Sequence, residues 1–147
     1  MQNKINHVGV AVRNLEDALN FFQIAFGFEP TKKVRSSKMQ AAFIQIGKTD
    51  LELIEPIHPE SFIAKFIAEK GEGLHHISLQ VTNIETTLQM LEKKGITALD
   101  KEPKIGLHGT KITFLNPEHT MGILIELCEK PTTSHKIHDE DTEIHDL

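Results

Sequence analysis

The sequence predicts an α+β fold in which two tandem β-α-β-β-β modules form one curved mixed sheet. The first observation is a repeat: residues 7–16 are HVGVAVRNLE and residues 76–85 are HISLQVTNIE, with histidine, asparagine and glutamate at matching positions 69 residues apart. The second is that an alternating segment is followed by helical spacing in each copy. The third is that each copy closes on a glutamate between two aliphatic residues, LEL at 51–53 and IEL at 125–127.

Each module begins with a strand and a helix. In residues 5–12 three valines alternate with a histidine, a glycine and an alanine, and residues 76–81 repeat this two-residue period. We expect the valine face to cover a helix and the histidine face to lie opposite it. Asn14 and Asn83 are favourable N-caps for the helices that follow, and a glycine ends each helical pattern.

The rest of each module is predicted to consist of three strands. The strand-like segments are 29–35, 40–46 and 50–55 in the first copy, and 97–100, 110–115 and 122–128 in the second. Phe62, Ile63, Phe66 and Ile67 recur at helical spacing between the copies, which predicts a helix there. The chain is therefore expected to form a single domain over residues 1–130 (module one 4–56, linker helix 57–73, module two 74–130). A polar, mobile tail is expected at 131–147.

Composition narrows the class of protein. The chain has 147 residues, of which 39% are hydrophobic and 25% charged, an ordinary globular balance for one domain. A net charge of −5 argues against a nucleic-acid partner, which usually requires a basic face. Cys128 is the only cysteine, the N-terminus lacks the apolar run of a signal peptide, and no segment has the roughly 20 apolar residues of a membrane span. We expect a soluble, cytoplasmic protein with no membrane partner.

Four side chains are candidates for one metal site. Glu52 and Glu126 each lie between two aliphatic residues, so they point away from the apolar face of their strands. His7 and His76 are on the corresponding face of the first strand of each module. A sheet curved around that face would bring all four together, and four buried polar groups without partners would carry a large desolvation cost. A divalent cation relieves that cost, although duplication for folding alone is the simpler alternative.

The donor set indicates the kind of ion. Two imidazoles and two carboxylates without thiolates suit a borderline divalent cation such as Co²⁺, Ni²⁺, Mn²⁺, Fe²⁺ or Zn²⁺. We expect octahedral coordination with two positions open to water or substrate, which is typical of a catalytic rather than a structural site.

These segments resemble the vicinal oxygen chelate (glyoxalase–bleomycin resistance) superfamily, and within it the methylmalonyl-CoA epimerase family. The resemblance covers nearly all of residues 4–130. The segments that carry it are INHVGVAV at 5–12, LELIEP at 51–56, GLHHI at 73–77, PKIGLHG at 103–109, FLNP at 114–117 and GILIEL at 122–127. The linker from Ser61 to Gly73 is also similar to that family.

The resemblance implies a cleft that holds one divalent metal, with His7, Glu52, His76 and Glu126 at the ligand positions. It implies a homodimer that interconverts (2R)- and (2S)-methylmalonyl-CoA, an acyl-CoA thioester, by proton transfer at C2 through a metal-stabilised enolate. Glu126 is then both a ligand and the catalytic acid/base.

The second proton-transfer group is left open. Some members of the family carry a further glutamate on the strand where this chain has Ala41, and Gln40, Lys38 and His108 are the candidates to replace it. The loop containing Lys104, Gly106 and His108 is expected to contact substrate, because glycine permits close backbone approach. The expected substrate-binding residues are therefore Gln40, Lys104, Gly106 and His108.

Several other functions remain alternatives. A glyoxalase I-type enzyme acting on the hemithioacetal of a 2-oxoaldehyde uses the same four ligand types and passes through an enediolate. Extradiol dioxygenases use two histidines and one glutamate, so the fourth donor argues against them. A metal-free drug-binding module of the bleomycin-resistance type needs none of the four donors, and their retention argues against it. An enzyme acting on another CoA thioester or a 2-oxo acid is the last alternative.

Overall fold

The structure, a computed structural model, describes residues 2–107 and 109–129, so His108 and the predicted tail at 131–147 lie outside the described residues. Two β-α-β-β-β modules are present, which confirms the predicted fold class. The first consists of β1 (Ile5–Ala11), α1 (Leu15–Phe26), β2 (Lys32–Arg35), β3 (Met39–Ile46) and β4 (Thr49–Pro56). The second consists of β5 (Gly73–Val81), α3 (Ile84–Glu92), β6 (Lys104–Ile105), β7 (Lys111–Phe114) and β8 (Ile125–Glu129). Helix α2 (Phe62–Lys70) joins the modules, and a short 3₁₀ helix, η1 (Pro117–His119), precedes β8.

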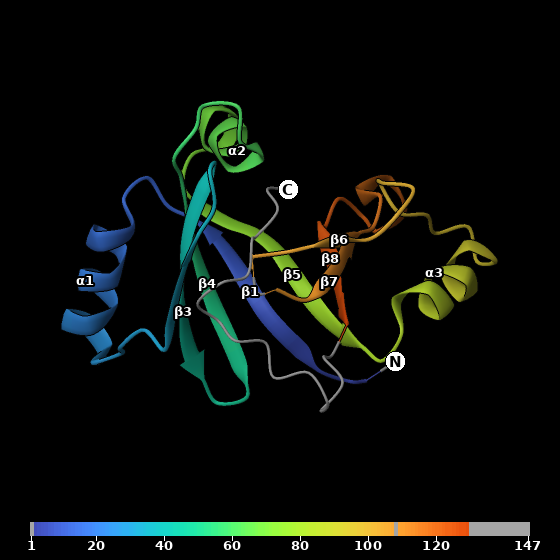
Figure 1. Cartoon of the computed structure of the whole chain (residues 1–147), viewed down its shortest axis with the longest axis horizontal. Coiled ribbons are helices and arrows are strands. Elements are labelled where there is room, and N and C mark those ends of the chain that lie inside the picture. Colours follow the sequence, from blue (N-terminus) through green and yellow to red (C-terminus); the bar gives the residue numbers. More distant parts are fainter. Residues whose placement is uncertain (1, 108, 130–147) are drawn as a thin grey trace.

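All eight strands belong to one mixed sheet in the order β2-β3-β4-β1-β5-β8-β7-β6. The modules meet at its centre, where β1 and β5 pair antiparallel, and each of these strands pairs in parallel with the last strand of its own module. Figure 1 shows β1 and β5 running between α1 and α3, which lie at opposite ends of the molecule. The first and last strands of both modules therefore lie side by side at the middle of the sheet.

The predicted caps begin the helices. Asn14 accepts a hydrogen bond from the backbone N–H of Asp17 at 2.9 Å, and Asn83 accepts one from the N–H of Thr86 at 2.8 Å. Gly27 ends α1 with φ of 71°, in the left-handed region that glycine adopts without steric cost. Ser61 caps the linker helix through the N–H of Ala64.

The helices cover different parts of the sheet. Helix α1 packs through Leu15 and Leu19 against Leu53, and α3 makes the corresponding cluster with Leu127 in the second module. Helix α2 packs through Ile63 and its neighbours against β1, β3 and β4 on the opposite face, the face that carries His7 and Glu52. The site face is thus closed at one end by α2, while α1 and α3 cover the two ends of the other face.

The centre of that other face has no helix packed on it among the described residues. Val8 of β1 pairs with Ile77 of β5, and neither belongs to the helix-packed clusters. The two side chains line a mainly apolar hollow of about 640 Å³ together with Leu74 and Ile123, and Phe66 and Lys70 of α2 line another part of it. We expected the valines of the first strand to pack against a helix. Val10 does so, against α1, whereas Val8 does not.

The prediction of a strand at 97–100 is wrong. That segment makes only one isolated bridge, between Ala98 and Leu115, and the strand that pairs with β7 is the two-residue β6 at Lys104–Ile105. The segment's apolar residues and threonine favour a strand locally, but a strand forms only where a partner strand lies alongside it. In the part of the chain that the structure describes, no helix is long and apolar enough to cross a membrane.

Candidate metal centre

Four central strands each contribute one of the predicted metal-site residues. His7 comes from β1, Glu52 from β4, His76 from β5 and Glu126 from β8. The strand register aligns them, since Gly9 pairs with both Glu52 and His76. All four residues are at most 4% exposed. The structure therefore brings together, beneath α2, the four side chains that the repeat singled out.

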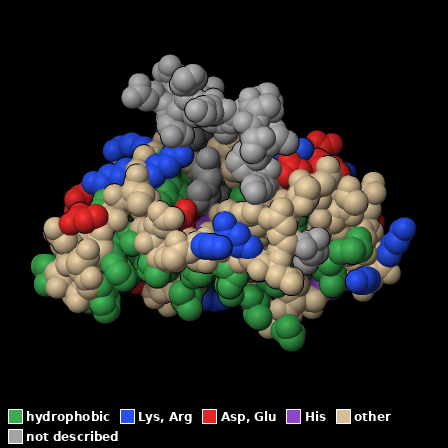
Figure 2. Space-filling model, turned by 90° about the horizontal axis from the view of Figure 1, so that it is seen from below, with side chains coloured by type: hydrophobic (Ala, Val, Ile, Leu, Met, Phe, Trp, Pro, Cys, Tyr) green, Lys and Arg blue, Asp and Glu red, His purple; other side chains and the backbone are tan. Residues whose placement is uncertain are grey.

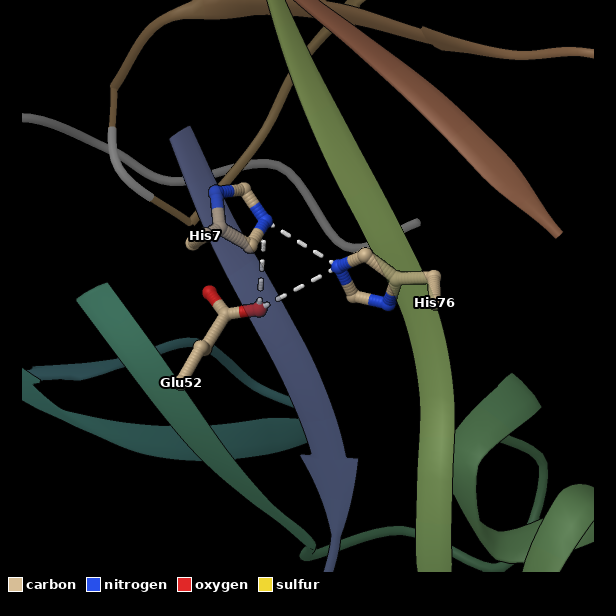
Figure 3. A group of neighbouring side chains, drawn as sticks. All are labelled: His7, Glu52 and His76. Carbon is tan, nitrogen blue, oxygen red and sulfur yellow. Dashed lines mark hydrogen bonds and ion pairs between the residues drawn. The ribbon is translucent and has the colours of Figure 1, made fainter. Parts of the chain in front are cut away.

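The donor atoms of these residues converge. His7 Nε2 lies 3.0 Å from His76 Nε2, 3.2 Å from Glu126 Oε1 and 3.8 Å from Glu52 Oε1. His76 Nε2 lies 3.6 Å from Glu52 Oε1 and 3.8 Å from Glu126 Oε2. Figure 3 shows the ring nitrogens of both histidines and the carboxylate of Glu52 pointing toward one another. One donor atom from each of these three residues lies within 4.8 Å of the others, a spacing that can hold an ion.

Burial sets the protonation of this cluster. Burial and, to a lesser degree, the negative charges of Glu126 and Asp50 raise the pKa of Glu52 well above its usual value. Burial lowers the pKa of His7 to about 3, so this imidazole is neutral at pH 7 and retains a ligating lone pair. A neutral His7 imidazole and a Glu52 carboxylate that disfavours its charged form fit a divalent cation, whose charge offsets the cost of ionising the carboxylate.

Ser78 is a neighbour of the cluster that the sequence reasoning did not identify. It is fully buried, and its hydroxyl donates a 2.8 Å hydrogen bond to Glu126 Oε1. The register pairs Ser78 with His7 on one side and with Glu126 on the other. The signal in the sequence was its position two residues after His76, which places both side chains on the same face of β5.

Two cavities that share the lining residues Phe62 and Ile112 lie near the cluster. The smaller is lined by Glu52, His76 and Glu126 together with apolar residues that include Phe62 and Ile112. Phe62 and Ile112 also line a larger cavity of about 370 Å³ between α2 and the second module. The larger cavity has mainly apolar walls, and its charged lining residues are three lysines and three acids: Lys65, Lys70, Lys104, Glu69, Asp100 and Glu102.

The predicted substrate-binding residues are placed differently. Gly106 lines the smaller cavity, and Lys104 lines the larger one, where its ammonium group lies 3.3 Å from Asp100. Gln40 is not brought to the site, because it pairs with Glu55 and hydrogen-bonds to that carboxylate on the face opposite Glu52. The interpretation of Gln40 as a residue that contacts substrate is therefore corrected. His108 lies outside the described residues.

Known proteins share this sequence pattern. The chain matches the family described as the glyoxalase/bleomycin resistance protein/dioxygenase superfamily over residues 6–114. It is 37% identical over 127 residues to the mitochondrial methylmalonyl-CoA epimerase of Homo sapiens, a match that covers 84% of this chain and 72% of the human protein. It is 34% identical over 131 residues to the ethylmalonyl-CoA/methylmalonyl-CoA epimerase of Cereibacter sphaeroides, covering 86% of this chain and 98% of that protein.

The similarity extends to three dimensions. The structure of Streptomyces coelicolor methylmalonyl-CoA epimerase in complex with 2-nitronate-propionyl-CoA superimposes with a TM-score of 0.84 at 29% sequence identity. That match covers 90% of this chain and 100% of the Streptomyces chain. The similarity therefore spans both modules.

Proposed function

The chain belongs to the glyoxalase/bleomycin resistance protein/dioxygenase superfamily, and from that membership we propose that it interconverts (2R)- and (2S)-methylmalonyl-CoA. The observation that carries the proposal is the convergence of His7, Glu52, His76 and Glu126 in a chain similar along most of its length to named epimerases. We also propose that residues 1–130 form the single domain that performs this reaction.

The four converging side chains are proposed to hold one divalent cation, such as Co²⁺, Ni²⁺, Mn²⁺, Fe²⁺ or Zn²⁺. The site suits this role because its donors are nitrogen and oxygen atoms, are buried, and come from four different strands of a rigid sheet. When bound, the ion supplies Lewis-acid stabilisation of the negative charge that develops on the thioester oxygen.

Proton transfer is proposed to use Glu126. A base must remove the proton from C2, and an acid must return a proton to the opposite face of the same carbon. The Glu126 carboxylate borders the smaller cavity, and the Ser78 hydroxyl fixes its Oε1 atom. Burial of this carboxylate keeps bulk water away from the proton-transfer group.

The larger cavity is proposed to receive the arm that carries the acyl group. A CoA thioester must extend from the metal centre to solvent, and the larger cavity adjoins the smaller one at Phe62 and Ile112, which line both. Its apolar walls suit the methylene groups of the arm.

A homodimer is proposed on the basis of the uncovered centre of the sheet. Leu74 is 75% exposed beside the apolar hollow that Val8 and Ile77 line, between the two ends of the face covered by α1 and α3. Figure 2 shows hydrophobic side chains gathered along one edge of the molecule. A second copy of the chain would remove this surface from water. Light scattering on the purified protein measures the assembly, and Leu74→Glu should give the monomer.

The test of function is an epimerase assay on metal-stripped and reloaded protein. The protein is treated with a chelator, reloaded with each candidate divalent ion, and given one C2 epimer of methylmalonyl-CoA, and the appearance of the other epimer is followed. We expect turnover only after reloading. Gln40→Leu, on the face opposite the site, is the matched control and should retain full activity.

The same preparations separate the alternatives. Reloaded protein that leaves methylmalonyl-CoA unchanged but converts the hemithioacetal of methylglyoxal and glutathione would replace the epimerase by a glyoxalase-type activity. Protein that binds no divalent ion by calorimetry would contradict the metal-dependent mechanism and favour a metal-free binding module.

A further inference from the structure

We infer that Asn6 and His75, the residues immediately before the two histidines of the metal centre, are positioning residues that fix the tautomer of each ring. Each contacts the Nδ1 atom of the following histidine, so that its Nε2 atom is left with the lone pair a metal requires. The inference rests on the proposed role of His7 and His76 as ligands and adds two residues to it.

Asn6 and His75 occupy equivalent positions of the duplicated chain. They are 69 residues apart, the same separation as His7 and His76. Their side chains are chemically unlike, an amide in one copy and an imidazole in the other. Both nevertheless offer an atom that can accept a hydrogen bond from an imidazole N–H.

Each of the two residues is the extra residue of an irregularity in the central strand pair. Ile5 pairs with Leu79 and His7 with Ser78, so Asn6 has no residue opposite it. In the same ladder Gly9 pairs with His76 and Val10 with Leu74, which leaves His75 unmatched. In a regular strand, successive side chains point to opposite faces. A bulge re-aims one of them, and here it brings the preceding side chain beside the histidine ring.

The contacts of Asn6 determine which way its amide points. Its Nδ2 atom donates to Gln80 Oε1 at 3.1 Å, and Gln80 Nε2 donates in turn to Gln2 Oε1 at 2.5 Å. With its amide nitrogen used in this way, Asn6 presents Oδ1 to the ring, 2.8 Å from His7 Nδ1. An amide oxygen can only accept, so the proton is on His7 Nδ1 and the lone pair is on Nε2.

His75 makes the corresponding contact to the following histidine in the second module. His75 Nδ1 lies 2.8 Å from His76 Nδ1. The His75 ring is held between two rings of α2, with centroids 5.1 Å from Phe62 and 4.9 Å from Phe66. One of two imidazole nitrogens in such a pair donates and the other accepts. When His76 offers Nε2 to a metal, its Nδ1 donates and His75 accepts.

The test compares variants that remove one acceptor while keeping the shape of the side chain. Asn6→Leu removes the amide oxygen, His75→Phe removes the ring nitrogen but keeps a ring between Phe62 and Phe66, and Asn6→Asp keeps an acceptor oxygen. Gln40→Leu is the matched control, because it makes the same change of an amide to an aliphatic group on the opposite face. Circular dichroism with thermal melting confirms that each metal-free variant is folded.

Two readouts decide the outcome. Titration calorimetry with Zn²⁺ should show affinity lowered about 10–100-fold in Asn6→Leu and His75→Phe, near wild type in Asn6→Asp, and unchanged in Gln40→Leu. Imidazole ¹⁵N NMR of the metal-free protein should show a protonated Nδ1 on His7 in the wild type and a mixture of tautomers in Asn6→Leu. Wild-type affinity together with wild-type tautomers in Asn6→Leu and His75→Phe would overturn the inference.

The two readouts also separate this inference from the proposed function. A wild-type protein that binds no divalent ion would defeat the proposed metal-dependent reaction. The tautomer measurement, made without metal, would still decide whether Asn6 sets the protonation of the His7 ring.

Discussion

The backbone of Gly9 lies directly beneath the imidazole ring of His76. A Cβ atom at Gly9 would lie 2.2 Å from His76 Cε1 and 2.4 Å from His76 Nδ1, closer than non-bonded carbon and nitrogen atoms can approach. The two residues face one another across the central pair of strands, so only glycine at this position lets the ring lie flat over β1.

Replacing Gly9 by alanine should displace the His76 ring. We expect Gly9→Ala to weaken metal binding by about tenfold or more and to lower the free energy of unfolding by about 1–3 kcal/mol, as overpacking does. Calorimetric metal titration and urea unfolding measure the two effects. Val10→Ala, at the next position on the other face, should lose some stability but keep its metal affinity. Unchanged affinity in Gly9→Ala would show that the ring does not need this space.

Removing the Ser78 hydroxyl should slow catalysis more than it weakens the metal site. The hydroxyl donates to the Glu126 carboxylate, and a hydrogen bond to a charged group contributes roughly 1.5–3 kcal/mol. We expect Ser78→Ala to lower kcat by about tenfold or more, with a smaller change in metal affinity. Ser78→Thr keeps a hydroxyl and should retain most of the wild-type kcat. A wild-type kcat in Ser78→Ala would mean that this hydrogen bond does not position the acid/base.

The four converging side chains were predictable because strand alternation and the sequence repeat can both be read from short segments of the chain. Alternation within a strand placed His7 and Glu52 on one face, and the repeat assigned His76 and Glu126 to the same places in the second module. Two strands that pair at the centre of a duplicated sheet then brought the copies together.

Features that depend on distant pairing were not predictable. The bulges at Asn6 and His75 exist only in the register between β1 and β5, which the sequence of either strand does not specify. The false strand at 97–100 has the same origin, since the segment lies beside β7 over a single bridge. Gln40 was one of three candidates because it neighbours Ala41, where some relatives carry a glutamate, although alternation already placed it on the face opposite Ala41, where it pairs with Glu55.

A buried hydroxyl is predicted to cost the protein stability. Thr113 Oγ1 is buried and has no hydrogen-bond partner among the residues that the structure describes. We expect Thr113→Val to raise the free energy of unfolding by about 1 kcal/mol, because it removes an unsatisfied polar group at similar volume. Thr87→Val is the control and should be destabilising, since the Thr87 hydroxyl donates to the Asn83 carbonyl at 2.8 Å. Urea unfolding measures both, and a loss of stability in Thr113→Val would contradict the prediction.

The thiol of Cys128 should be inert in the folded protein. Burial raises its pKa to about 12 from the usual 9.0, so the reactive thiolate is scarce at pH 8. We expect no reaction with an aromatic disulfide reagent in buffer and one thiol titrated in guanidinium. The raised pKa also means that the folded state binds its proton more tightly than the unfolded state. The protonated Cys128 thiol therefore makes its full contribution to the free energy of unfolding below pH 9, and this contribution is lost as the pH rises toward 12.

Thermal melting of the wild type and Cys128→Ala checks that pH dependence. Between pH 9 and pH 12 the wild type should lose stability more steeply than the variant, because the variant has no thiol to ionise on unfolding. Parallel curves, or rapid modification of the native thiol at pH 8, would show that Cys128 is not buried as described.

Proton NMR in D₂O tests the role of Glu126 most directly. Metal-loaded protein is mixed with methylmalonyl-CoA, and the loss of the C2 proton signal is followed for the wild type and for Glu126→Gln. We predict rapid exchange in the wild type and a rate at least about 100-fold slower in the variant, which keeps the shape of the side chain but removes its basicity. Exchange at the wild-type rate in Glu126→Gln would contradict the role of Glu126 as acid/base. No exchange in metal-loaded wild type would contradict the epimerase itself.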